Sequence, residues 1–407
     1  MTPTAARSVS AAERLASVRP YLAGTVLFAV AMGVGRFAYT PLLVVMRGDA
    51  GLGVTLAGIL ASANLAGYLA GALAAALPAM HRRRVAVVIG AAAAIAVLTA
   101  SMAGPGWLWI PARTLTGICS GLVFVLTVGI VLDHAKLHCS PWGAALLFAG
   151  VGLGIAASGL LVPAFAPLGG SRAAWLGIGA LSGIAVALVA RWVPRDEPAH
   201  ADAEPIGTAA RTGPSRVFWL LALVYGVEGG AYIIPATFLV AMMAETPALA
   251  PIAPFTWVVV GLIAVPSAAL WTAAARRIGV AAALTLALAA QALALLIPSA
   301  AGGFTGALAV AIGIGGTFIA ISALALTLGR TYWPARSNAA AGVLTALYGV
   351  GQIAGPLFAT HVAVRTGSYR AALPLAAAAL LATTVPFVLA YAISSTRWAE
   401  KTRKRVS

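Results

Sequence analysis

The sequence is poor in charged residues, and poorest in acidic ones. Charged residues make up 9% of the 407 positions, whereas soluble domains carry about 25%. The chain holds 26 Lys and Arg against 10 Asp and Glu, while 61% of its residues are hydrophobic. Such a chain cannot cover its apolar surface with charged groups, which excludes an ordinary water-soluble fold. The composition instead fits a protein whose solvent is lipid.

Cysteines and catalytic motifs are also scarce. The two cysteines, Cys119 and Cys139, give no disulfide framework. Asp133, His134 and His138 lie close to Cys139, but they belong to a short polar connection, so we expect a solvated loop there and no bound metal. The sequence has no Walker motif, dinucleotide fingerprint or catalytic triad pattern. We therefore expect no cofactor, no ATP hydrolysis and no enzymatic activity.

Twelve long apolar runs are the dominant feature. A membrane span needs about 20 apolar residues, and only helices or closed barrels satisfy the backbone inside lipid. The first run, of about 26 residues, is too long for a cleavable signal peptide. Because the runs are continuous rather than alternating, they predict helices at 20–46, 52–78, 84–104, 107–131, 140–167, 173–193, 216–243, 254–275, 278–299, 304–329, 338–362 and 370–393.

A polar stretch at 194–215 divides these runs six and six. It is rich in Pro, Ala, Asp and Glu and has no apolar periodicity, which predicts a flexible linker. We therefore expect an all-α membrane protein with two pseudo-symmetric six-helix bundles. Its expected parts are a cytoplasmic tail at 1–19, bundles at 20–193 and 216–393 on either side of the linker, and a basic cytoplasmic tail at 394–407.

Lys and Arg are distributed unevenly between the loops. With the N-terminus inside, 20 of the 26 fall in inside segments, and only Arg47, Arg172, Arg365 and Arg370 fall outside. The positive-inside rule then places both termini in the cytoplasm. The same distribution explains most of the +16 net charge. We therefore expect no nucleic-acid partner, and we expect anionic membrane lipid to attract the basic C-terminal tail.

The two halves of the sequence resemble each other. Glycine, tyrosine, proline and arginine recur in the same order, so chance similarity between Ala/Gly-rich helices is the weaker explanation. Six helices in each half make the repeats parallel, which places a solute near the bilayer midplane between the halves. The matched segments are 33–41 with 226–235, 150–152 with 349–351, and 170–174 with 367–372.

Several of these strings resemble known transporter motifs. Residues 113–121, RTLTGICSG, are similar to the RxxxGxGxG motif of the major facilitator superfamily, with Cys119 at the middle glycine. The strings GVGRFAYTPLL at 33–43 and AYIIPATFL at 231–239 resemble the YbfB/YjiJ family of bacterial transporters. The resemblance implies the major facilitator fold, multi-pass insertion in the bacterial inner membrane, and movement of a small solute by alternating access.

Three ionisable residues lie clearly inside predicted spans, where charge is costly and marks function. They are Arg36, Arg113 and Glu228. Aligning Tyr39 with Tyr232 places Arg36 and Glu228 at neighbouring positions of the two repeats, and the resemblance places both at the central cavity. We hypothesise that they approach one another in at least one conformational state. A static ion pair between the halves and the absence of any contact are the alternatives.

The balance of these charges predicts the charge of the solute and the identity of the coupling ion. Two buried cations against one carboxylate leave a local charge of +1, which an anionic or amphipathic solute would neutralise. The protonation of Glu228 is expected to depend on whether Arg36 pairs with it or with the solute, which would couple transport to protons. Arg113 has a second interpretation, because in the motif that it resembles the arginine braces the backbone of the first helix.

Four further polar residues complete the predicted solute site: Tyr39, Asn64, Tyr232 and Gln352. Hydrogen bonding between helices is the simpler interpretation for Asn64 and Gln352, as it is for Gln291. Core packing is an equal alternative for the two tyrosines.

The sequence as a whole predicts a secondary active transporter for a small organic solute. Protons are the expected coupling ion, another ion is the alternative, and a monomer is the expected assembly. A membrane sensor or assembly factor that uses the same fold without transport is the competing interpretation. That alternative predicts no solvent-reachable cavity near Arg36 and Glu228.

Overall fold

The structure is a computed structural model that describes residues 11–75, 87, 90–91, 106–137, 143–194, 214–300 and 303–406. All regular elements in these ranges are helical. The long helices are α1 (Ala11–Phe28), α2 (Tyr39–Asp49), α3 (Val54–Ala75), α5 (Trp109–Leu137), α6 (Gly143–Phe165), α7 (Gly170–Val189), α8 (Arg216–Ala244), α9 (Ala253–Ile278), α10 (Val280–Ala300), α11 (Gly303–Tyr332), α12 (Ser337–Thr366) and α13 (Ala372–Val406).

Eleven helical segments of the described chain are long and apolar enough to cross a membrane. They correspond in order to eleven of the predicted runs, from Val18–Asp49 to Tyr369–Ser394. The remaining predicted run, 84–104, lies outside the described residues except at positions 87, 90 and 91. The helical ends differ from expectation, since α1 already begins at Ala11 and α13 continues to Val406 through the predicted basic tail. The chain is thus a multi-pass helical protein.

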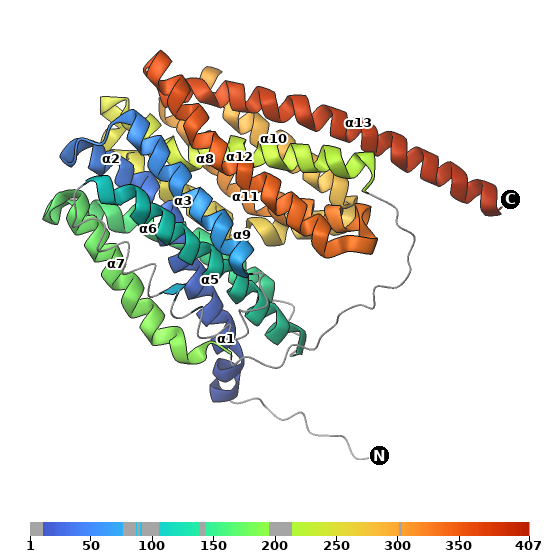
Figure 1. The fold of residues 1–407 in the computed structure, drawn as a ribbon, viewed down its shortest axis with the longest axis horizontal. Helices are drawn as coiled ribbons and strands as arrows, with labels where there is room; N and C mark the ends of the chain where they lie inside the picture. The colour runs from blue at the N-terminus through green and yellow to red at the C-terminus, as the bar shows by residue number, and fades with distance from the viewer. Residues whose placement is uncertain are drawn as a thin grey trace.

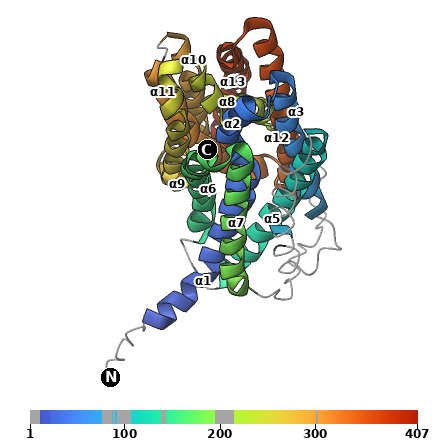
Figure 2. The ribbon, with the colours of Figure 1, turned by 90° about the vertical axis from the view of Figure 1, so that its left-hand side faces the viewer.

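The helices form two groups, one from each half of the chain. In Figure 1 the group from α1 to α7 runs from blue to green, and the group from α8 to α13 runs from yellow-green to red. The groups diverge toward the first turn of α1 and the last turn of α13, which we call the termini side. They meet at the opposite, far side, where α3 packs against α12 and α6 packs against α9. Figure 2 shows α3 beside α12 from a second direction.

The first span is not one continuous α-helix. A π-helical segment, η1 (Ala29–Phe37), separates α1 from α2, and Ala38 forms the join. Pro41 lies in the first turn of α2 and has no N–H to donate to the carbonyl four residues earlier, that of Phe37. The α-helical hydrogen bonding is therefore interrupted directly after Arg36, and π-helical turns of this kind are frequent at functional sites.

Glycines allow the first helix of each half to approach a second helix closely, at positions related by the repeat. A Cβ atom on Gly33 would overlap the backbone of Gly154 in α6. In the other half, a Cβ atom on Gly351 of α12 would overlap the carbonyl of Gly226 in α8. The glycine-rich strings at 150–152 and 349–351 therefore serve backbone contact between helices, as small residues do in membranes.

On the far side of each half, a carboxylate at the end of one helix bonds to the start of another. Asp49, at the end of α2, accepts a hydrogen bond from the backbone N–H of Ser171 in α7. Glu245, directly after α8, accepts from the N–H of Tyr369 at 3.3 Å and pairs with Arg370 at 3.8 Å. Ser171 and Tyr369 belong to the matched segments of the repeat. The two halves therefore have equivalent hydrogen bonds from a backbone N–H to a carboxylate at this side.

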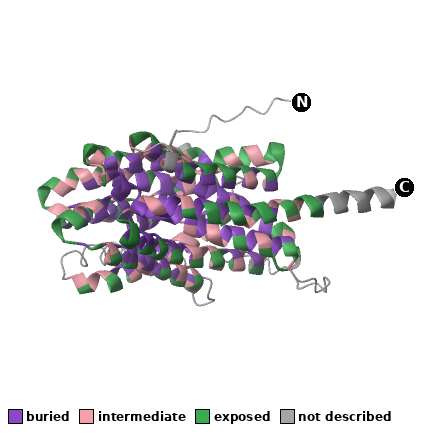
Figure 3. Cartoon of the chain, turned by 90° about the horizontal axis from the view of Figure 1, so that it is seen from above, coloured by how far each residue is buried: buried purple, intermediate pink, exposed green. Residues whose placement is uncertain are grey.

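The buried residues lie along the axis of the molecule, and exposed residues lie on its outside, as Figure 3 shows in purple and green. Many exposed residues are large and apolar, such as Leu188 at 62% and Leu270 at 65% exposure. In a soluble protein such a surface would be an aggregation hazard. Here these side chains lie on spanning helices and form the surface that contacts lipid.

Candidate functional site

Arg36 lies at the junction between the two halves. It is the penultimate residue of η1 and is 6% exposed. Its Nη2 donates a 2.8 Å hydrogen bond to the hydroxyl of Tyr232 in α8. The guanidinium carbon lies 4.9 Å from the ring centroid of Phe37 and 5.0 Å from that of Tyr68. Arg36 forms no salt bridge with any described residue, and its Nε has no hydrogen-bond partner there.

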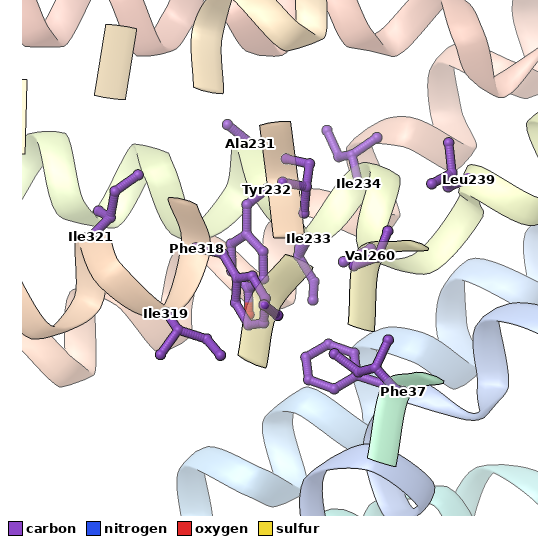
Figure 4. Close-up of a cluster of buried hydrophobic side chains, with 14 of the residues drawn as sticks. Phe37, Ala231, Tyr232, Ile233, Ile234, Leu239, Val260, Phe318, Ile319 and Ile321 are labelled. Carbon is purple, nitrogen blue, oxygen red and sulfur yellow. The ribbon is translucent and has the colours of Figure 1, made fainter. Parts of the chain in front are cut away.

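Tyr232 is the contact point that joins Arg36 to the second half. Its hydroxyl also accepts a hydrogen bond from Nε2 of Gln352 in α12. Its ring stacks on Phe318 at 5.5 Å and on Tyr348 at 5.7 Å, with interplanar angles of 8° and 7°. In Figure 4 the rings of Tyr232 and Phe318 face one another, and Phe37 approaches from the first half. The centre of the molecule is thus a cluster of aromatic rings around one guanidinium group.

Arg113 braces the first span. Its Nη1 donates to the carbonyl of Gly35 at 3.2 Å, and its guanidinium carbon lies 4.7 Å above the ring of Tyr39. Asn64 in α3 donates to the carbonyl of Arg113 at 3.0 Å and to that of Gly35 at 3.4 Å. The Gly35 carbonyl belongs to η1, so side chains from α3 and α5 together hold the segment that carries Arg36. These contacts match the interpretation in which Arg113 braces the backbone of the first span. They also match the interpretation in which Asn64 forms hydrogen bonds between helices.

The two repeat-related tyrosines have different surroundings. The Tyr39 hydroxyl donates to the carbonyl of Ala57 in α3 at 3.0 Å, so it is engaged within its own half. Tyr232 instead receives hydrogen bonds from both halves. Both side chains are 2% exposed. The structure therefore brings Tyr232 to Arg36 and holds Tyr39 in the core of the first half.

Glu228 lies in the core of the second half and is fully buried. Its Oε1 accepts a 3.1 Å hydrogen bond from Nε2 of Gln291 in α10, and its Oε2 has no partner among the described residues. The hydroxyl of Thr317 in α11 lies 2.8 Å from Oε1 of Gln291 and extends this network. No ion pair joins Arg36 and Glu228 in this structure. Their connection is indirect, because Tyr232 follows Glu228 by about one turn of α8.

The sequence analysis missed four aromatic residues of this centre: Tyr68, Tyr225, Phe318 and Tyr348. Tyr225 stacks on Tyr348 at 4.3 Å with an interplanar angle of 15°. Tyr225 and Tyr232 lie three residues before and four residues after Glu228, a spacing that places all three on one helix face. That spacing could have identified Tyr225. The other three come from helices whose relative rotation the sequence does not reveal.

Two further hydrogen bonds join the halves on the far side of this centre. The Thr40 hydroxyl donates to the carbonyl of Ala236, and the Ser62 hydroxyl donates to that of Ile353 at 2.8 Å. On the termini side, every residue of α9 after Ser267 is half-buried or exposed. Contact between the halves continues past Arg36 to Gly152, which lies against Gly261 and Val265, and the halves diverge beyond it on the termini side.

Solved structures of other proteins have the same fold as this chain. Two crystal structures of the nucleoside transporter NupG are 13% identical to this chain. A mutant form superimposes with a TM-score of 0.71, over 91% of this chain and 99% of the other. The second structure gives a TM-score of 0.69, over 92% and 99%. The likeness shows that the chain has the fold of a major facilitator transporter.

A comparison with protein-family models assigns the chain to one family within this superfamily. The family model described as "Uncharacterised MFS-type transporter YbfB" matches residues 28–387. The chain therefore belongs to this family of the major facilitator superfamily, as its motifs predicted. No curated protein sequence matches the chain significantly.

Proposed function

We propose that this chain is a secondary active transporter that moves a small organic solute between two six-helix bundles by alternating access. The observation that carries the proposal is a buried arginine at the junction of the two halves with no carboxylate partner. A charge in such a position is costly unless it has a function. Arg36 is the group that we assign to the solute.

The bundles are residues 20–193 and 216–393, with the linker 194–215 between them. Cross-half hydrogen bonds at Thr40 and Ser62 lie on the far side, and the halves diverge on the termini side. We assign the far side to the outside of the bacterial inner membrane and the termini side to the cytoplasm, because Lys and Arg concentrate there. The arrangement corresponds to an inward-facing state. Rocking of one bundle against the other would open the far side.

Within the site, we assign solute binding to Arg36, Tyr232 and Gln352. Tyr232 accepts hydrogen bonds from both other residues, so a bound solute competes for donors that are already in place. We assign no solute contact to Arg113, Asn64 and Tyr39. They position the residues that bind the solute, because they hold the backbone of η1 and α2. This division sharpens the predicted set of six residues into three that contact the solute and three that position the helix.

We assign proton coupling to Glu228. It is fully buried, and its one hydrogen-bond donor among the described residues, Gln291, is neutral. An ionised carboxylate in such surroundings is costly, and a proton removes that cost. In a state in which α8 shifts relative to η1, Arg36 or water replaces the proton as the partner of Glu228. Protonation would therefore accompany the conformational change.

Transport is tested with purified full-length protein. A thermal-shift screen against metabolites and drugs identifies a stabilising solute, and uptake of that solute into proteoliposomes measures flux. We expect Arg36→Gln to abolish both the stabilisation and the flux. Arg365→Gln is the matched control, since Arg365 is exposed near the end of α12. Binding without flux in any proteoliposome condition would favour the sensor alternative and overturn the proposal.

Proton coupling is tested separately with Glu228→Gln. Glutamine keeps an oxygen that accepts from Gln291, so the packing of the second half is preserved. We expect solute exchange to persist while uptake driven by a pH gradient is lost. Retention of gradient-driven uptake with unchanged pH dependence would refute the role of Glu228.

A further inference from the structure

Of the two buried guanidinium groups, that of Arg36 is the one placed to meet a solute at the junction of the halves. Arg113 is 3% exposed, and it is committed to the Gly35 carbonyl and the ring of Tyr39. Arg36 and Arg113 each keep a buried Nε without a partner among the described residues, but only Arg36 reaches the second half, through the Tyr232 hydroxyl. Glu228 is bound to Gln291 and does not neutralise it. The one guanidinium that faces the junction matches one carboxylate, whereas the second carboxylate of a dianion would find no second guanidinium there and would be buried without a partner.

The present acceptor of the guanidinium is a neutral phenol oxygen. Arg36 uses Nη2 for Tyr232, while Nε is buried and unpartnered. Both groups lie on the same guanidinium fork, which matches the two oxygens of a carboxylate. A carboxylate would therefore gain charge-assisted hydrogen bonds that Tyr232 cannot supply. The nearby Gln352 amide, now donating to Tyr232, would remain paired through that hydroxyl.

The remaining surface around Arg36 is aromatic. Phe37 and Tyr68 flank the guanidinium at about 5 Å. Phe37 also contacts Phe318 at 6.1 Å in an edge-to-face arrangement. Tyr68 and Tyr348 are half-buried, so part of each side chain is accessible beside the fully buried groups. Offset stacking and edge contacts of this kind favour a flat ring over a saturated one.

From these observations, and resting on the proposed transport function, we infer that the site selects a planar aromatic monocarboxylate. Its carboxylate binds the Nε and Nη atoms of Arg36, and its ring packs against Tyr68 and Tyr348. The inference names the class of solute by charge, shape and aromaticity. It excludes dianions, neutral amides of the same shape and saturated rings as preferred ligands.

Four small probes test the three parts of this selectivity with purified full-length protein in detergent. Benzoate is the reference, benzamide removes the charge, cyclohexanecarboxylate removes the aromaticity, and isophthalate adds a second charge. Isothermal titration measures the Kd of each. We expect benzoate to bind at least about tenfold more tightly than benzamide and isophthalate, and several-fold more tightly than cyclohexanecarboxylate.

Two variants assign the preferences to residues. Arg36→Gln should weaken benzoate binding by at least about tenfold and remove the preference for benzoate over benzamide. Tyr68→Leu should remove the preference over cyclohexanecarboxylate and leave the preference over benzamide intact. The matched controls are Arg365→Gln and Trp107→Leu, because both side chains are exposed. If Arg36→Gln fails to fold, the ratios measured in the unmodified protein still decide the inference.

The results separate this inference from transport itself. Benzoate that does not bind at up to about 10 mM, or that binds no better than benzamide or isophthalate, overturns the inference. If a solute of another class loses its binding in Arg36→Gln, the proposed site stands and the solute class assigned here is wrong. If no solute depends on Arg36, both the class and the site are wrong.

Discussion

The hydrogen bonding of Tyr232 predicts a large cost for removing one oxygen atom. Tyr232→Phe keeps the ring and its stacking on Phe318 and Tyr348 but deletes the acceptor for Arg36 and Gln352. Each buried donor left unpaired costs about 1–3 kcal/mol, and more if it is charged. With two such donors, we therefore expect the free energy of unfolding to fall by about 2–6 kcal/mol. Reversible unfolding in detergent micelles with increasing SDS, followed by circular dichroism, measures this change.

The repeat supplies a matched control in Tyr39→Phe. That variant also loses one hydroxyl from a tyrosine that is 2% exposed, but the lost hydrogen bond joins only a neutral backbone carbonyl. Hydrogen bonds of this type in membrane helices average about 0.6 kcal/mol. Tyr39→Phe should therefore cost well under half as much as Tyr232→Phe.

A double-mutant cycle identifies the source of the difference. In an Arg36→Met background, Tyr232→Phe leaves only the Gln352 amide unpaired, so its cost should fall to about 1–2 kcal/mol. Equal costs for the two tyrosine variants would refute the reasoning, as would a Tyr232→Phe cost that is unchanged when Arg36 is absent. Either result would mean that the guanidinium does not depend on the phenol oxygen.

Three further variants test other contacts by the same unfolding measurement. Gln291→Leu removes the donor to Glu228 and should cost about 1–3 kcal/mol; a neutral effect would mean that the carboxyl has another partner. Gly351→Ala places a Cβ against a backbone carbonyl and should cost about 1–3 kcal/mol, while Gly342→Ala, with open space around it, should cost nothing measurable. Glu245→Gln removes a partly exposed ion pair and one of the two carboxylate acceptors that Ser368 and Tyr369 use, so we expect a loss of about 1 kcal/mol, of which high salt suppresses the ion-pair part.

The membrane spans could be predicted from the sequence because every helix that crosses a bilayer must present apolar side chains to lipid. Each helix needs a long apolar run, and eleven such runs were located in order. The interruption at η1 was not predicted. Pro41 was visible in the sequence, but Pro235 lies one residue beyond the related position and α8 continues through it as one helix. A proline within a span therefore does not by itself determine whether the helix stays regular.

Only the charged residues of the candidate site could be predicted from the sequence, because a charge inside a lipid-embedded helix is costly and therefore conspicuous. That rule identified Arg36, Arg113 and Glu228, and the structure places the first beside Tyr232 and the second against the Gly35 carbonyl. Their partners depend on the rotation of each helix about its axis, which a uniformly apolar sequence leaves undetermined. A direct Arg36–Glu228 pair was a reasonable hypothesis from the repeat. In this structure Gln291 holds Glu228 instead, and whether the pair forms in another state is open to the Glu228→Gln experiment.

The repeat is broken at the positions of the two buried charges, Arg36 and Glu228. Aligning Tyr39 with Tyr232 sets Arg36 opposite Gly229 and Glu228 opposite Gly35, so each half carries one charge where the other has a glycine. Gly229 lies against Tyr348, and a Cβ on Gly35 would press on Ser120. Neither glycine position has room for a long side chain in the state described here. In the proposed mechanism the two halves therefore cannot exchange roles: one supplies the cation and the other the carboxyl, and relative motion of the halves would change the separation between them. A transporter whose coupling depends on that separation needs this asymmetry, whereas a purely structural ion pair between the halves would leave the two groups in contact.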